Sequence, residues 1–75
     1  MSIKVRLRSP VLLALVARRN YSQNGLARGL GVSSGYMSQL LRGKRLPSPQ
    51  MREKLMKFVG IEDFDELFIV EDERQ

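Results

Sequence analysis

Two segments of the stretch YSQNGLARGLGVSSGYMSQLLRG, residues 21–43, share one local design. In each, a serine that can cap a helix follows an apolar or aromatic residue, and a second apolar residue stands five positions after the first. The two sets are Tyr21, Ser22 and Leu26, and Val32, Ser33 and Met37. This is the spacing of a hydrophobic staple, and it predicts helices over 23–30 and 34–42.

The turn between these two helices is short, and Gly31 suits a left-handed helix end. A turn of this length prevents the helices from lying side by side along their length. They should therefore cross steeply, which predicts a helix-turn-helix with a core at about residues 22–43.

The flanking segments add three more helical signals. Ser9 and Pro10 can cap and begin a first helix whose apolar stripe holds Leu12, Leu13 and Val16. Ser48 and Pro49 can begin a fourth helix that ends at Gly60, with Met51, Leu55, Phe58 and Val59 on its inner side. The segment IEDFDELF, residues 61–68, predicts one further helical turn. The arginines and lysines at positions 18, 19, 52, 54 and 57 are expected to be solvated surface residues.

The two ends of the chain have complementary patterns. IKVRLR, residues 3–8, alternates apolar and basic residues, and FIVEDE, residues 68–73, is β-prone and then acidic. An antiparallel pair of these segments would place opposite charges across from each other. We expect one domain over 1–75, all-α with five helices and a small ribbon of this kind. The alternatives are two unstructured tails, or an edge that pairs with a second copy.

Composition narrows the function classes. Cysteine and histidine are both absent, which removes thiolate and imidazole metal ligands and the usual acid–base group near neutral pH. Residues 1–60 hold twelve basic residues and one acidic residue, whereas residues 61–75 hold one basic and seven acidic residues. A basic body with an acidic tail indicates a polyanion partner, with charge for solubility as the alternative. We therefore expect no enzyme activity, cofactor, bound metal or small-molecule substrate. The chain lacks a membrane-length apolar run, and we expect it in the cytoplasm.

The helix predicted over 34–42 has one uncharged exposed side, formed by Ser34, Gly35, Ser38 and Gln39. Met37, Leu40 and Leu41 point the other way, into the core. Small hydroxyls and a glutamine can approach and hydrogen-bond base edges in a major groove, and glutamine suits adenine N6 and N7. Cations on either side of the helix suit the phosphates: Arg28, Arg42, Lys44 and Arg45.

The start of the helix predicted over 23–30 adds a phosphate site. Backbone N–H groups are unpaired there, and Ser22, Gln23 and Asn24 can reinforce them. The hydroxyl of Tyr36 is expected to contact a phosphate, with the ring along the wall of the groove. The alternative is that the ring covers the edge of the core.

Residues 21–48, YSQNGLARGLGVSSGYMSQLLRGKRLPS, resemble the helix-turn-helix of the lambda-repressor/Cro-like (XRE) family. The matching residues are Ser22, Gln23, Leu26, Ala27, Leu30, Gly31, Val32, Ser33, Met37, Ser38, Gly43 and Pro47. A looser resemblance links the chain ends to compact regulators of actinobacteria and their phages. The resemblance implies a five-helix domain in which Ser34, Gly35, Ser38 and Gln39 contact bases. It also implies contacts to the sugar–phosphate backbone of DNA by Gln23, Arg42, Lys44 and Arg45. Gly35 departs from the family in having no side chain at a base-contacting position.

These observations predict a sequence-specific double-stranded DNA-binding regulator, a repressor or Cro-like switch that acts as a homodimer on a palindromic operator. The alternative is a protein-interaction module on the same scaffold, as in an antitoxin or antirepressor partner. RNA is a weaker candidate because exposed aromatic residues for stacking are scarce.

Overall fold

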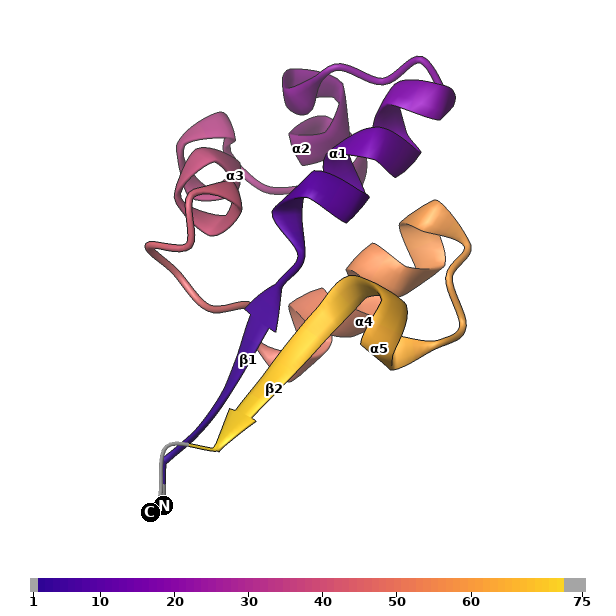
Figure 1. Cartoon of the computed structure of the whole chain (residues 1–75). Helices are drawn as coiled ribbons and strands as arrows, with labels where there is room; N and C mark the ends of the chain where they lie inside the picture. The colour runs from indigo at the N-terminus through magenta and orange to yellow at the C-terminus, as the bar shows by residue number, and fades with distance from the viewer. Residues whose placement is uncertain (1, 73–75) are drawn as a thin grey trace.

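Five helices surround one apolar core, and a two-stranded ribbon projects from them at one end (Figure 1). The computed structural model describes residues 2–72. Along the chain the elements are β1 (Ile3–Leu7), α1 (Ser9–Arg18), α2 (Gln23–Leu30), α3 (Ser34–Leu41), α4 (Pro49–Val59), α5 (Phe64–Leu67) and β2 (Phe68–Asp72). The predicted five-helix domain with a terminal ribbon is confirmed. Three residues of the acidic tail, Glu73, Arg74 and Gln75, lie outside the described residues.

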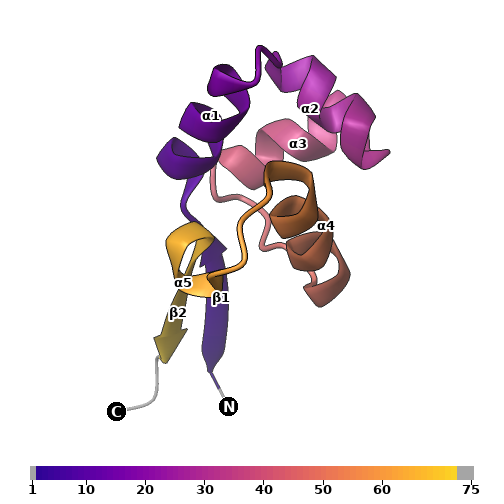
Figure 2. The same ribbon diagram turned by 90° about the vertical axis from the view of Figure 1, so that its right-hand side faces the viewer.

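Three serines begin the helices as the sequence predicts. The Oγ atoms of Ser22, Ser33 and Ser48 accept hydrogen bonds from the backbone N–H three residues later, at 3.0, 3.1 and 3.1 Å. Each bond satisfies one of the unpaired N–H groups at a helix start. Gly31 and Gly60 end α2 and α4 at φ values of 74° and 70°, in the left-handed region that glycine adopts without strain. Figure 2 shows α2 and α3 crossing after the short turn.

The predicted cap of α1 is wrong. Ser9 is the first residue of the helix, and its Oγ donates a 2.7 Å hydrogen bond to the backbone oxygen of Leu41 at the end of α3. The last carbonyls of a helix lack partners within it, so this bond satisfies one of them and ties α1 to α3. Arg8 occupies the cap position and provides no side-chain cap.

The core gathers apolar side chains from all five helices and from β2. Its buried members are Leu12, Val16, Leu26, Ala27, Leu30, Met37, Leu40, Met51, Leu55, Val59, Leu67 and Phe68. Leu13, predicted in the core, is 41% exposed, whereas Leu15 is half-buried. A helix turns about 100° per residue, so Leu13 lies off the stripe that Leu12 and Val16 define. Phe58 is half-buried and lies against the ring of Tyr21, with centroids 5.1 Å apart.

Strands β1 and β2 are antiparallel, with Val5 opposite Val70 and Leu7 opposite Phe68. Phe68 is buried, whereas Val70, farther along the ribbon, is 53% exposed. Arg6 and Glu71 form an ion pair at 3.6 Å across the two strands. The predicted pairing of a basic with an acidic strand is therefore confirmed, and the ribbon is formed within one chain.

Arg19, predicted as a solvated residue, has a structural contact. Its guanidinium donates to the backbone oxygens of Phe58 and Val59, both at 2.8 Å. These carbonyls lie at the C-terminal end of α4, where a positive charge is favourable. Arg19 therefore fixes the end of α1 to the end of α4. Arg52, also predicted as an ordinary surface residue, lies over the ring of Phe64 at 6.0 Å.

Candidate nucleic-acid interface

The exposed side of α3 carries the uncharged residues that the sequence placed there. Ser34, Gly35 and Gln39 are exposed and Ser38 is half-buried, while Met37 and Leu40 are buried on the opposite side. A Cβ atom added to Gly35 would have no neighbour within 4 Å, so the surface above it is open. The predicted orientation of α3 is confirmed, and base contact by these four residues stays a prediction.

The start of α2 lies beside the start of α3. Gln23 and Asn24 are exposed in the first turn of α2, and Ser22 Oγ caps that turn. Asn24, Arg28 and Ser34 line one shallow hollow between the two helices. The predicted phosphate site and the predicted base-contacting side are therefore adjacent on the surface.

Several basic side chains are engaged within the chain, and others have no partner. Arg6, Arg8, Arg19 and Arg52 each bond a carboxylate or a backbone oxygen. Within residues 2–72, no hydrogen bond or ion pair involves the side chain of Arg28, Arg42 or Lys44, and all three are exposed. These three side chains flank α3 along the chain. Their charges are available to an anionic partner.

The loop after α3 is held by its backbone. The N–H of Gly43 bonds the carbonyl of Leu40 at 3.2 Å, and the N–H of Lys44 bonds the carbonyl of Gln39 at 2.9 Å. Gly43 has a φ of 76°, so the chain turns there in the left-handed region. The backbone of the loop therefore has a fixed position relative to α3, which sets the points from which its basic side chains extend.

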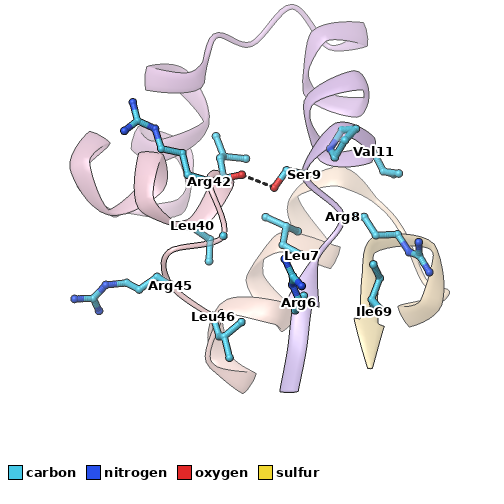
Figure 3. Close-up of a pocket in the computed structure, with 13 residues that line it drawn as sticks. Arg6, Leu7, Arg8, Ser9, Val11, Leu40, Arg42, Arg45, Leu46 and Ile69 are labelled. Carbon is cyan, nitrogen blue, oxygen red and sulfur yellow. Dashed lines mark hydrogen bonds between the residues drawn. The ribbon is translucent and has the colours of Figure 1, made fainter. Parts of the chain in front are cut away.

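A groove of about 340 Å³ lies between this loop, β1 and the start of α1. Figure 3 shows the residues that line it. Leu7, Val11, Leu46 and Ile69 give it an apolar lining, and the Ser9–Leu41 bond crosses its upper part. Arg42 and Arg45 also line the groove, and in this view the ends of their side chains extend away from it. The two arginines are thus directed outward from the loop.

One cluster was not predicted from the sequence. Arg45 Nε donates to Gln39 Oε1 at 3.1 Å, and the Arg45 guanidinium lies over the ring of Tyr36 at 5.6 Å. The three residues come from α3 and the loop after it. The sequence assigned Arg45 and Tyr36 to phosphates and Gln39 to bases, and it contained no signal that the three side chains touch.

A second group also escaped the sequence analysis. Lys54 and Lys57, expected to be ordinary surface residues, line a hollow together with Arg28, Gly29 and Phe58. A Cβ atom on Gly29 would lie 2.5 Å from Phe58 Cε1, so the glycine permits this close packing of α2 on α4. The sequence of α4 alone gives no indication that Lys54 and Lys57 lie near Arg28 of α2.

A comparison with protein families supports this geometry. The family model described as a helix-turn-helix domain matches residues 11–67, which run from the third residue of α1 to the end of α5. The chain belongs to the XRE-like helix-turn-helix family. This family member is 31% identical over 65 residues to the uncharacterized HTH-type transcriptional regulator YvzC of Bacillus subtilis (strain 168). The match covers 87% of this chain and 83% of that protein. No solved structure gave a significant match.

Within the described part of this helix-turn-helix chain, no helix has the length and apolar character needed to cross a membrane. The same residues contain no group of three or more acidic, cysteine or histidine side chains placed to hold a metal ion.

Proposed function

We propose that this helix-turn-helix protein is a sequence-specific double-stranded DNA-binding transcriptional regulator, a repressor or Cro-like switch that acts in the cytoplasm. The observation that carries the proposal is the uncharged, open side of α3, flanked by Arg28, Arg42 and Lys44, which have no partner in the described chain. The proposed activity is binding without catalysis.

In this proposal α3 enters the major groove. The groove is about 12 Å wide and admits a helix whose leading side is small. Four residues contact base edges: Ser34, Gly35, Ser38 and Gln39. Gly35 brings the backbone itself close to the bases, since nothing of the chain lies above it. With no side chain there, sequence-dependent DNA shape contributes part of the specificity.

The phosphates on either side of the groove are bound by two groups of residues. The first group lies at the start of α2 and comprises Ser22, Gln23, Asn24 and Arg28. The second group lies along and after α3 and comprises Tyr36, Arg42 and Lys44. Contacts of this kind fix the position of a protein on DNA and supply salt-dependent affinity.

The same proposal includes a homodimer on a palindromic operator. Two copies related by a two-fold axis would place their α3 helices in half-sites about one helical turn, ~34 Å, apart. Ile3 and Val70 are 47% and 53% exposed at the outer part of the ribbon, which supplies apolar surface for a second copy. Sedimentation of the protein with and without DNA measures this association directly.

A protein-interaction module is the second candidate, and one observation favours it. Val11 and Leu46 are 38% and 44% exposed beside the groove in Figure 3. A partner protein would cover such apolar residues, whereas it would gain little from the Ser, Gly and Gln side of α3. A partner bound at this groove with no affinity for any duplex would support the second candidate.

Selection from random duplex DNA tests the first candidate, with Gln39→Ala as the variant. We expect the variant to lose about 1–3 kcal/mol on the selected site and its preference at one base pair. Gln50→Ala is the matched control, because Gln50 is an exposed helical glutamine like Gln39 but belongs to α4. Equal losses by the Gln39 variant on every sequence would contradict base contact.

A further inference from the structure

The cluster of Tyr36, Gln39 and Arg45 lies on the exposed side of α3 and determines how two of its members can meet DNA. Arg45 Nε is 3.1 Å from Gln39 Oε1, and Arg45 Cζ lies over the Tyr36 ring, 5.6 Å from its centroid. Tyr36 is half-buried, so the ring is itself supported by the core. The guanidinium is thus placed by one hydrogen bond and one cation–π contact.

This position conflicts with the phosphate contact that the sequence alone predicts for Arg45. The major groove is about 8.5 Å deep, which separates base edges at its floor from phosphates at its rim. If Gln39 meets a base edge, a guanidinium hydrogen-bonded to its amide lies near the same floor. Arg42, which has no such bond, remains free to meet the backbone.

The groups of Arg45 that remain available match one base. Nε is used by Gln39, which leaves the two terminal nitrogens as a pair of parallel donors. Guanine presents two acceptors, O6 and N7, in the major groove, and a bidentate arginine is the commonest specific contact to them. We propose that Arg45, held by Gln39 and Tyr36, is a specificity-determining residue that binds guanine in the operator; this inference rests on the proposed function.

The bond to Arg45 also changes what Gln39 can recognise. A glutamine that binds adenine donates from its amide nitrogen to N7 and accepts from N6 through Oε1. Here one of the two acceptor positions of Oε1 is occupied by Arg45, so the two N–H donors of the amide outnumber the one acceptor position that remains for DNA. Together the two side chains form an array of donors. Such an array favours guanine over the adenine expected for Gln39 alone.

The test separates guanidinium geometry from charge. Arg45→Lys keeps the positive charge and loses the planar pair of donors. Arg42→Lys is the matched control, because Arg42 is an exposed arginine of the same loop with no partner in the described chain. Wild type and both variants are first checked by thermal unfolding, then taken through selection from random duplexes and through binding titrations at several salt concentrations.

We expect the wild type to select a guanine in each half-site. Arg45→Lys should reduce the preference for that guanine by roughly 5- to 150-fold, with the salt dependence of binding unchanged. Arg42→Lys should keep the preference. A guanine preference that survives Arg45→Lys, or an adenine at the position sensitive to Arg45 and Gln39, would overturn this inference and leave the DNA-binding function intact. A wild type without any sequence preference would instead remove the proposed function itself.

Discussion

Replacing Gly35 with leucine should change stability and DNA affinity in opposite directions. A Cβ at this position meets nothing within 4 Å, so the new side chain has no steric cost in the free protein. Glycine inside a helix costs about 1 kcal/mol relative to good helix formers such as leucine. Gly35 is the second residue of α3, where we expect about half of that gain, ~0.5 kcal/mol. This corresponds to a rise in melting temperature of about 2–4 °C.

The same leucine would stand between α3 and the base edges in the proposed complex. It should separate Ser38 and Gln39 from the bases and cost at least one base contact, about 1–3 kcal/mol, or roughly 5- to 150-fold in Kd. Thermal unfolding by circular dichroism and fluorescence anisotropy with a selected duplex measure the two effects. Ala14→Leu is the control, because Ala14 is exposed on α1, and it should leave affinity unchanged. Full affinity in a stabilised Gly35→Leu protein would refute groove insertion.

Three further changes test other contacts. Lys44→Ala should weaken binding to every duplex and reduce the slope of log binding constant against log salt concentration by about 1. The reason is that Lys44, which is exposed and whose side chain has no partner in the described chain, is assigned to a phosphate. An unchanged slope would remove that assignment. Arg19→Ala should lower the free energy of unfolding by about 1–2 kcal/mol in urea titrations, because two hydrogen bonds at the end of α4 are lost. Arg18 is exposed, so Arg18→Ala should change the same free energy by less than ~0.5 kcal/mol. Equal effects of the two substitutions would contradict the Arg19 contact. Ser33→Ala should cost about 1 kcal/mol through loss of the α3 cap, and an unchanged melting temperature would show that the cap is unimportant.

The local features of this fold were predictable because their signals lie within a few residues of each other. A serine cap acts on the N–H three residues later, and Gly31 and Gly60 act at their own positions. Amphipathic spacing was also sufficient to orient α3, so the exposed side holding Gln39 was correctly identified. The charge patterns of the two chain ends predicted the ribbon.

Contacts between distant segments were not predictable in the same way. Ser9 bonds Leu41, 32 residues away, in place of capping its own helix. Arg19 bonds carbonyls 39 and 40 residues away, and its sequence neighbours give no indication of them. Such contacts depend on how the helices pack, which a one-dimensional pattern does not specify.

The candidate site illustrates the same division. Residue types and helix spacing indicated which side chains are exposed on α3. The link from Arg45 to Gln39 and Tyr36 depends on the course of the loop after α3, which Gly43 and two backbone bonds determine. From sequence, an arginine in a basic loop is predicted to contact a phosphate, and the base contact that we propose for Arg45 rests on its neighbours in space.

The most direct test of the central claim is an NMR titration of the ¹⁵N-labelled protein with a selected duplex. If α3 enters the major groove, the largest amide shift changes outside the ribbon will fall at residues 22–24, 34–39 and 42–45. Shift changes concentrated on the outer side of α4 or on the β1 and α1 side of the groove in Figure 3, with α3 unaffected, would contradict the account.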